Sequence, residues 1–223
     1  MNKRIILISL LLLSTQLFAQ EEVKLKSGRT IIININGTWK YKQSSSDYGT
    51  FTDSRDGKVY KTVKIGTQTW IAENLSYKAS SGCWAYNDDV TNVAKYGYLY
   101  NWETAKNVCP VGWHLPTDAE WTTLLNYLGG YRVAGGKMKE TGTIHWESPN
   151  TGANDSIGFS GLPGGLRNVD GKTTTMGIAG YWWSSTECSQ TSAYHYRLYF
   201  GDEMNSQFET GKNRGFSIRC IKD

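Results

Sequence analysis

Four cysteines have the clearest capacity for covalent chemistry in this chain of 223 residues. They are Cys83, Cys109, Cys188 and Cys220, and no two of them stand in the C-x-x-C spacing typical of zinc sites and thioredoxin-like centres. An N-terminal apolar run predicts export, and the cysteines of exported proteins usually form disulfides. The sequence therefore predicts two disulfide bonds and no metal site.

Periodicity indicates how these cysteines pair. Cys109 continues a helical spacing of apolar residues that includes Trp102, which places its thiol on the buried face of a helix. Cys220 alternates with an isoleucine and a phenylalanine, which places it on the inward face of a strand. Two thiols that both face the interior are natural partners. We therefore predict the bonds Cys109–Cys220 and, from the remaining pair, Cys83–Cys188.

The residues suited to acid–base or metal chemistry are few. The three histidines, His114, His145 and His195, show no H-x-x-x-H spacing. His195 stands between two alternating tyrosines and is expected on the polar face of its strand, and Asp88-Asp89 lies in an irregular segment where solvation is expected. No glycine-rich loop precedes a helix as a phosphate site would require. The sequence predicts no catalytic residue.

The first 19 residues have the pattern of a secretory signal peptide. Lys3 and Arg4 precede an apolar run from Ile5 to Leu13, and Ala19 supplies a small residue at the expected cleavage point. Because the run is too short to span a bilayer and no cysteine follows it, we expect neither a transmembrane helix nor a lipid anchor. A secreted, periplasmic or cell-surface location follows.

The net charge limits the classes of partner. The formal charge is +4, and it falls to +2 (4 − 2) when Lys3 and Arg4 leave with the signal peptide. A nearly neutral chain lacks the basic stripe of a nucleic-acid-binding protein, so no nucleic-acid partner is expected. Aromatic residues make up 13% of the chain, which predicts a core of large rings.

The composition divides the mature chain into three parts. Residues 20–43 predict a β-rich N-terminal extension of two or three short strands. Residues 44–55 are polar and serine-rich, which predicts a linker. Residues 56–223 form the main domain, which opens with a predicted hairpin over residues 60–71.

Two helices are predicted between Tyr98 and Gly130. The first begins near Tyr98 and must end before Pro110, because the residue before a proline avoids the helical region. The second begins with a capping box between Thr117 and Glu120, carries an apolar stripe and ends at a glycine pair.

The rest of the domain is predicted to be strands and loops. Residues 130–180 contain several glycine pairs and few periodic runs, which indicates a long loop-rich insertion. Strands are expected at 111–115, 181–185, 193–200 and 216–221. The predicted fold class is α+β: two helices, a twisted antiparallel sheet and the insertion.

The spacing W-x-x-A-x-x-x-C from Trp102 to Cys109, followed by T-x-x-E at Thr117, resembles the two-helix core of C-type-lectin-like domains. In that family the cysteine that ends the first helix is bonded to a cysteine in the last strand. The resemblance therefore agrees with the pairing of Cys109 with Cys220.

Six motifs in order extend the resemblance to the major paralogous domain first described in Fibrobacter succinogenes, a family abundant in exported Bacteroidetes and Fibrobacter proteins. They are WIAENL at 70–75, NW at 101–102, CPVGWHLPTDAEW at 109–121, GFSGLPGG at 158–165, GYWWSST at 180–186 and GFSIRC at 215–220. The resemblance covers about residues 56–223. It implies a fold related to formylglycine-generating, or sulfatase-modifying, enzymes, and it implies no defined activity.

We expect an exported, non-catalytic binding module that recognises a glycan or a cell-surface protein through the loops of residues 130–180. Aromatic faces stack on sugars, and amide and carboxylate groups bond hydroxyls. The candidate ligand-binding residues are Trp146, Asn154, Asp155, Arg167, Asp170 and Trp182. Calcium has no supporting motif, because Ser148-Pro149-Asn150 lacks the acid of the lectin E-P-N sequence and no W-N-D follows, so no cofactor is expected.

Two alternatives remain. A structural or accessory surface protein without a small ligand fits the extension at residues 20–43 equally well. An oxidase of the formylglycine-generating type would need a reactive cysteine pair near the C-terminus, where only Cys188 and Cys220 lie. Because Cys220 is assigned to the bond with Cys109, this activity is not expected, and a titration of free thiols distinguishes the two hypotheses.

Overall fold

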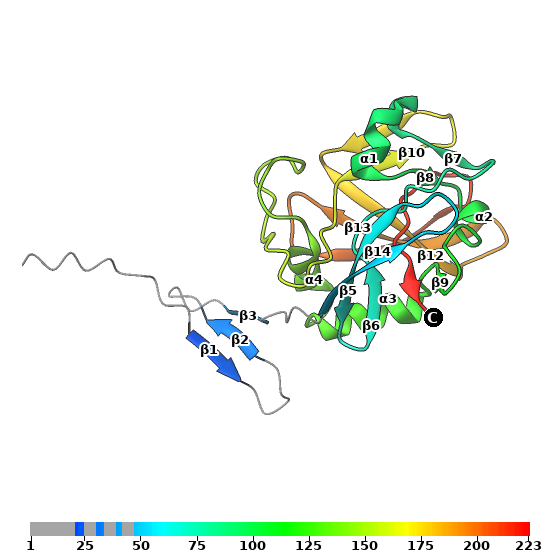
Figure 1. Cartoon of the computed structure of the whole chain (residues 1–223). Coiled ribbons are helices and arrows are strands. Elements are labelled where there is room, and N and C mark those ends of the chain that lie inside the picture. Colours follow the sequence, from blue (N-terminus) through cyan, green and yellow to red (C-terminus); the bar gives the residue numbers. More distant parts are fainter. Residues whose placement is uncertain (1–20, 25–29, 34–38, 42–46) are drawn as a thin grey trace, which may run out of the picture. The chain divides into compact units, whose positions relative to one another are not determined.

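A computed structural model describes residues 21–24, 30–33, 39–41 and 47–223 (Figure 1). Its contacts divide the chain into two compact units, Met1–Lys42 and Gln43–Asp223. The predicted signal peptide, residues 1–19, lies outside the described residues. No helix in the described part of the chain is long and apolar enough to cross a bilayer.

The first unit contains the short strands predicted for residues 20–43. Strands β1 (Glu21–Lys24), β2 (Thr30–Ile33) and β3 (Trp39–Tyr41) pair antiparallel in the order β1-β2-β3. Ile33 lies opposite both Glu21 on β1 and Trp39 on β3. β2 is therefore the central strand.

The linker predicted at residues 44–55 is wrong from Tyr48 onward. Strand β4 (Tyr48–Thr52) pairs antiparallel with β5 (Val59–Ile65), so the main domain starts before Asp56. The strand is mostly exposed. Its tyrosine, phenylalanine and threonines favour strands, but the serine-rich run before it led to the prediction of a linker. β4 is held by the ladder to β5 and by Phe51, whose ring lies 5.1 Å from that of Trp113.

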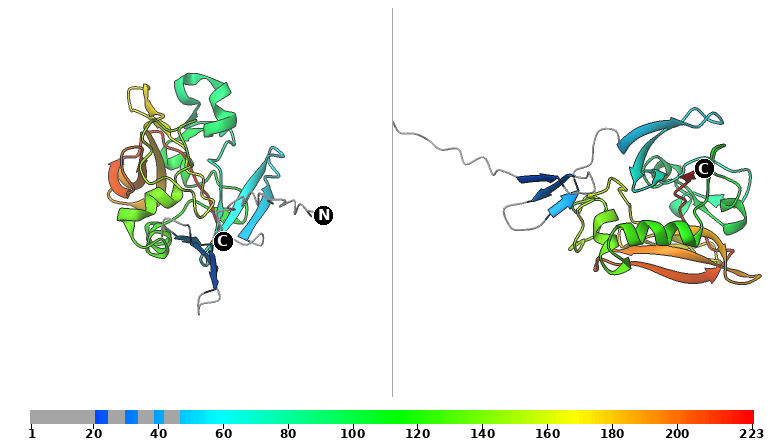
Figure 2. Two further views of the ribbon diagram at one scale, coloured as in Figure 1. Left: turned by 90° about the vertical axis from the view of Figure 1, so that its left-hand side faces the viewer. Right: turned by 90° about the horizontal axis from the view of Figure 1, so that it is seen from below.

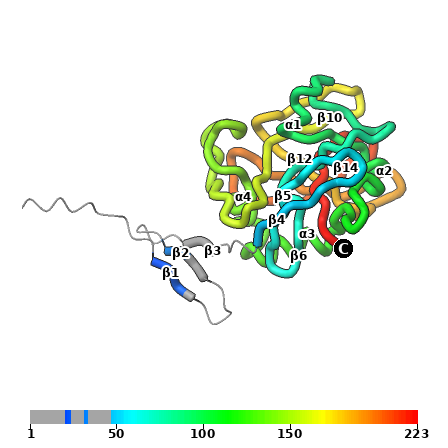
Figure 3. Tube along the Cα trace, in the orientation of Figure 1, coloured from blue at the N-terminus to red at the C-terminus, as the bar shows by residue number. Residues whose placement is uncertain are grey.

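The first sheet of the main domain has the order β4-β5-β6-β15-β9. The predicted hairpin is confirmed: β5 pairs with β6 (Gln68–Ile71), and Gly66 has a φ of 64° in the turn. The last strand, β15 (Ile221–Lys222), lies between β6 and β9 (Trp113–His114). The trace in Figure 3 shows this C-terminal strand beside the hairpins that open the domain.

The second sheet has the order β11-β10-β12-β13-β14. Its strands are β10 (Gly164–Arg167), β11 (Thr173–Met176), β12 (Ala179–Glu187), β13 (Ser192–Tyr199) and β14 (Asn205–Gly211). All pairs are antiparallel except β10 with β12, which meet in parallel at Gly165 and Gly180. The strands predicted at 181–185 and 193–200 are confirmed, and the mixed α+β class is confirmed with them.

The first predicted helix is much shorter than expected. Leu99–Tyr100 form strand β8, which pairs with β7 (Cys83–Trp84), and only Trp102–Ala105 form helix α2. The side chain of Asn101 accepts a hydrogen bond from the backbone of Thr104 at 3.0 Å and starts the helix there. Tyr100 also bridges to Phe216, so pairing with distant strands overrides the helical pattern. Between β7 and β8 lie two 3-10 helices, η2 (Tyr86–Asp88) and η3 (Val90–Asn92), and helix α1 (Val93–Tyr96).

The second predicted helix is confirmed. Helix α3 (Asp118–Tyr127) begins with a complete capping box between Thr117 and Glu120. It lies along the second sheet (Figure 2), where Trp121 stacks on Tyr196 with ring centroids 4.7 Å apart. α3 thereby closes one face of the sheet.

A helix that was not predicted, α4 (Tyr131–Met138), interrupts the segment predicted to be loop-rich. Its interior glycines, Gly135 and Gly136, weaken the helical signal in the sequence. The next residue, Lys139, is fully buried, and its ammonium group donates to the carbonyls of Thr151, Tyr199 and Asp202 at 2.7–3.0 Å. Burial lowers the pKa of Lys139 to about 8. This lysine holds the loops after α4 against the second sheet.

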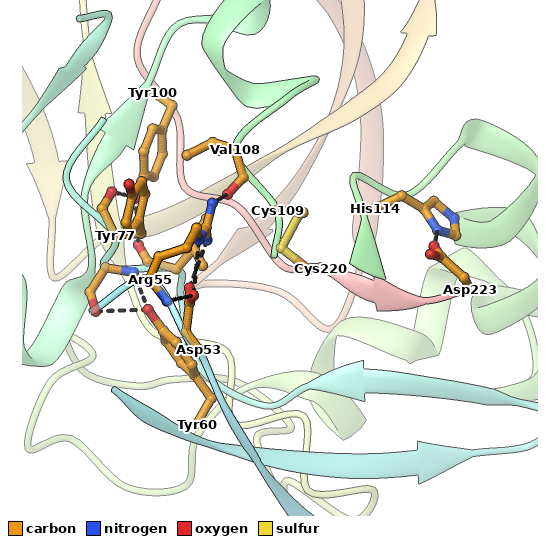
Figure 4. Close-up of a disulfide and its surroundings, with 12 residues drawn as sticks. Asp53, Arg55, Tyr60, Tyr77, Tyr100, Val108, Cys109, His114, Cys220 and Asp223 are labelled. Carbon is orange, nitrogen blue, oxygen red and sulfur yellow. Dashed lines mark hydrogen bonds and ion pairs between the residues drawn. A yellow bond between two sulfur atoms is a disulfide. The ribbon is translucent and has the colours of Figure 1, made fainter. Parts of the chain in front are cut away.

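The predicted disulfide between Cys109 and Cys220 is present (Figure 4), with an S–S distance of 2.02 Å and a sequence separation of 111. The predicted bond between Cys83 and Cys188 is wrong, since both thiols are free. Cys83 donates to the carbonyl of Ala79 at 3.3 Å. Cys188 lies instead near side chains at the end of the second sheet, among them Tyr194 and Glu209, so the two thiols have different neighbours. Pairing the two cysteines that remained after Cys109–Cys220 therefore predicted a bond that does not form.

Side-chain contacts connect the start of the domain to the segment that carries Cys109. Arg55 forms an ion pair with buried Asp53 at 2.6 Å and donates to the carbonyl of Val108 at 2.8 Å, next to Cys109 (Figure 4). Its guanidinium carbon lies 3.8 Å from the ring centroid of Tyr77. The start of the domain is thus fixed to the segment that carries the bridge.

Two apolar clusters fill the domain. One centres on Trp70, Trp121 and Trp182 and packs beneath α3. The other includes Trp183 and Cys220 and surrounds the disulfide. The large rings predicted for the core are therefore buried, as burial of their apolar area requires.

Candidate functional site

A cavity of about 550 Å³ opens where β4, β5, the segment after β6, helix α1 and the loop after α4 meet. Charged and polar side chains dominate its walls. The lining residues are Tyr48, Lys58, Lys61, Ala72, Glu73, Asn74, Ala94, Lys95, Glu140, Asp155, Gly158, Ser160, Leu162 and Arg219. We call this space the charged cavity.

Arg219 is the most deeply buried charge in the charged cavity, with no exposed surface. Its guanidinium donates to the side chain of Asn74 at 2.9 Å and to the carbonyls of Phe159 and Ser160 at 2.5 and 2.9 Å. Burial lowers its pKa to about 9, so it is cationic at neutral pH. Among the described residues, no carboxylate comes within 4.0 Å of this guanidinium.

Asn74 positions Arg219. Its oxygen accepts from Arg219 and from the indole nitrogen of Trp182, both at 2.9 Å. Its amide nitrogen donates to the carbonyl of Tyr96 and the hydroxyl of Ser217. Because each end of the amide has two partners, Asn74 is a fixed support and is not free to bind a ligand.

Asp155 supplies a partly buried carboxyl group to the same cavity. It accepts hydrogen bonds from the backbone and hydroxyl of Ser160 at 2.8 and 2.6 Å. Burial raises its pKa to about 6; the bonds from Ser160 and the charge of Arg219 oppose the shift. Its φ of 41° lies in the left-handed region, which asparagine and aspartate tolerate better than most residues.

The rim of the charged cavity carries both signs of charge and one aromatic ring. The rim cations are Lys58, Lys61 and Lys95. Glu140 supplies a negative charge, and its carboxylate lies 2.6 Å from the ring nitrogen Nδ1 of His145. Tyr48 is 51% exposed, which leaves much of its ring accessible. The arrangement supplies hydrogen-bond donors and acceptors side by side, together with a flat apolar surface.

Of the six candidate residues, only Asp155 lines the charged cavity. Trp146 and Trp182 belong to the core, where their indole nitrogens donate to the carbonyl of Gly161 and to Asn74. Trp182 therefore supports the cavity from beneath and does not reach a ligand there.

The other three candidates are surface residues elsewhere. Asn154 is exposed and accepts from the backbone of Ser156, as a turn residue does. Arg167 lies over the ring of Trp84 at 4.1 Å, and Asp170 is exposed in the turn between β10 and β11. The loops of residues 130–180 thus contribute to more than one surface.

Two residues of the charged cavity, Arg219 and Asn74, were not among the candidates predicted from the sequence. Both lie in motifs that carry the family resemblance, GFSIRC and WIAENL. Arg219 stands between two positions predicted to face inward, Ile218 and Cys220, where alternation predicts an outward, solvated charge. No signal in the residue pattern therefore indicated that its guanidinium is buried.

The histidines and free cysteines lie outside the charged cavity. In the part of the chain that the structure describes, no group of three or more His, Cys, Asp or Glu side chains could hold a metal ion. His195 is buried against Trp183 and Phe216 and not on a polar face as predicted, because β13 turns it toward the C-terminal segment. His114 bridges Glu120 and Asp223 at 2.8 and 2.6 Å.

Comparison with known proteins identifies the family and no individual relative. The family model for the Fibrobacter succinogenes major domain matches residues 63–222, well over half of the chain. Searches of curated proteins and of solved structures found no match. The match covers the second sheet, the first sheet except β4 and the start of β5, the disulfide and most residues of the charged cavity. The chain therefore belongs to the Fibrobacter succinogenes major domain family.

Proposed function

We propose that this protein is an exported, non-catalytic binding module that holds a hydroxyl-rich glycan in the charged cavity. The observation that carries the proposal is the relation of Arg219 to Asp155. Both line one cavity, yet they form no ion pair within 4.0 Å. Among the described residues the Asp155 carboxylate has no cation partner, while the buried Arg219 supplies positive charge from behind the wall. A sugar hydroxyl both donates and accepts, so it can donate to Asp155 and accept from an accessible rim ammonium such as that of Lys61.

Size and shape support a small ligand. About 550 Å³ lies within the range of pockets that hold small molecules. The accessible ring of Tyr48 offers a face on which a pyranose can stack. A C-type-lectin-like arrangement of the domain is part of this proposal, and the bond between Cys109 and Cys220 supports it.

A non-catalytic role is supported by the cysteines. An oxidase of the formylglycine-generating type would use a thiol pair near the C-terminus, whereas Cys220 is bonded to Cys109. Burial raises the pKa of Cys188, which lowers its thiolate fraction. The disulfide also supports export, since such bonds persist in oxidising compartments.

A glycan array probed with the purified protein, with and without calcium, tests the proposal. Each glycan that binds is then titrated by calorimetry against Asp155→Asn and Asp170→Asn. Both aspartates were candidates from the sequence, but only Asp155 lines the cavity. We expect Asp155→Asn to weaken binding about tenfold or more, since hydrogen bonds to a charged group are the stronger ones, and Asp170→Asn to leave it unchanged.

Two lysines of β5 extend the test. Lys61→Ala removes a cation from the charged cavity, and Lys64→Ala removes an exposed cation of the same strand that does not line it. Weaker binding in the first variant alone indicates an acidic glycan. Absence of any bound glycan, or equal losses in Asp155→Asn and Asp170→Asn, would contradict the proposal.

Attachment to a surface partner is a second candidate function, supported by the separate three-stranded unit β1–β3. Three strands of three or four residues bury little apolar area, so such a unit gains stability from a partner. Deleting residues 20–43 should abolish cell-surface retention while glycan binding by the main domain is kept. Unchanged retention would remove this role.

A further inference from the structure

A second cavity, of about 490 Å³, lies between α3 and β14. It shares no lining residue with the charged cavity. Its walls are Thr122, Leu125, Asn126, Gly130, Tyr131, Tyr196, Asn205, Ser206, Gln207 and Phe208. We call this space the α3–β14 cavity.

Asn205 gives the α3–β14 cavity an unfilled hydrogen-bonding position. Its side chain is fully buried, and its amide nitrogen donates to the sulfur of Met138 at 3.3 Å. Its side-chain oxygen has no hydrogen-bond partner among the described residues. A buried amide oxygen without a donor is costly, so this oxygen at the cavity wall is a position where a bound molecule can supply the donor.

The apolar part of the wall is rigid and aromatic. Tyr196 is 2% exposed, stacks on Trp121 and donates to the carboxylate of Asp118 at 2.5 Å, which fixes its ring. Leu125 is buried beside it, and Tyr131 at the entrance is 49% exposed. Flat rings on a fixed wall favour a flat ligand, because offset stacking and apolar burial then act together.

We propose that the α3–β14 cavity binds a planar aromatic molecule that carries an N–H or O–H donor for the side-chain oxygen of Asn205. The side chains of Gln207 and Asn126 line the same cavity and are exposed, which provides polar contacts at the entrance. This site is independent of the glycan proposed for the charged cavity. Failure of one leaves the other unaffected.

Indole and 1-benzofuran are the probes, since they share one shape and only indole has an N–H donor. Each is titrated into isotope-labelled protein, and amide chemical shifts are followed by NMR. Indole should shift the amides of α3 and β14 saturably and bind about tenfold or more tightly than 1-benzofuran, because the isostere leaves Asn205 unpaired. Asn205→Ala should abolish that preference.

A pair of substitutions on the surface of α3 distinguishes blocking of the cavity from a general effect of the added side chain. Asn126→Trp fills the entrance from an exposed position of α3, and Thr123→Trp places the same side chain at an exposed position that does not line the cavity. Indole binding should be lost in the first variant and kept in the second. Equal binding of the two probes, equal losses in the two variants, or no saturable shift with indole would each overturn the proposal.

Discussion

A methyl group added to Gly135 would lie 2.2 Å from the carbonyl oxygen of Met204. Helix α4 and the segment before β14 therefore touch backbone to backbone, and the amide of Gly136 donates to the carbonyl of Glu203 at 3.2 Å. Only glycine permits this approach. The glycine pair that made this stretch resemble a loop is what packs the helix against the sheet.

Gly135→Ala should destabilise the domain by about 1–3 kcal/mol or more, because the methyl group must displace backbone atoms of Met204. The measurement is the free energy of unfolding from urea titrations. Gly211→Ala is the control, since a methyl group there has no atom within 4 Å and the backbone is not left-handed. Wild-type stability in Gly135→Ala would show that α4 does not pack on Met204.

Loss of the Cys109–Cys220 bond should cost on the order of 3–5 kcal/mol, because it releases a long loop in the unfolded chain. The double variant Cys109→Ser/Cys220→Ser, unfolded in urea beside the unmodified protein, measures this. A thiol titration of the denatured, unreduced protein checks the pairing independently. Two thiols, from Cys83 and Cys188, are expected; a count of zero would mean that a second bond exists.

His195 should make the protein sensitive to acid. Burial, with help from Arg197 and Arg214, lowers the pKa of His195 to about 3, whereas an unfolded histidine titrates near 6.5. Between these two pKa values the unfolded state binds a proton at His195 and the folded state does not. The free energy of unfolding therefore decreases as pH falls from about 6.5 towards 3. His195→Phe, whose ring suits the contact with Phe216, should flatten that part of the stability–pH curve.

The pKa of His114 is shifted in the opposite direction to that of His195. Burial alone would lower the pKa of His114, but its hydrogen bonds with Asp223 and Glu120 outweigh burial and raise it. A raised pKa stabilises the fold below about 6.5, and this contribution is lost as pH rises through the folded value. His114→Gln should therefore lose stability at acidic pH and match the unmodified protein at alkaline pH. If the stability–pH curves of His114→Gln and His195→Phe were identical below pH 6.5, both the raised pKa of His114 and the lowered pKa of His195 would be contradicted.

Asp155→Asn should stabilise the domain at pH 8 while weakening the glycan binding that we propose. The carboxylate has a pKa of about 6, so its ionisation is disfavoured in the fold, and stability falls as pH rises from about 3.8 to 6. Asparagine keeps an acceptor for the backbone N–H of Ser160 and places an NH2 donor against its hydroxyl, which can accept, without the charge. The gain should reach up to about 3 kcal/mol. Thermal unfolding at pH 4 and pH 8 measures it. A loss of stability at pH 8 would show that the ionised carboxylate supports the fold.

The sequence alone determined the features that depend on neighbouring residues or on strict periodicity. Thr117 and Glu120 are three positions apart, so the capping box and α3 follow from local chemistry. Cys109 and Cys220 each sit on an apolar repeat, which was enough to pair them. The hairpin at Gly66 needed only its turn residue and the alternation on each side.

The tertiary structure alone decided whatever depends on contacts between distant segments. Leu99 and Tyr100 fit a helical stripe, yet pairing with β7 makes them a strand. Arg219, Asn74 and Asp155 are separated by up to 145 residues, and only the packing of the C-terminal segment under the loop after α4 brings them to one cavity. A residue pattern records which face of its own element a side chain occupies; it does not record which other element that face will meet.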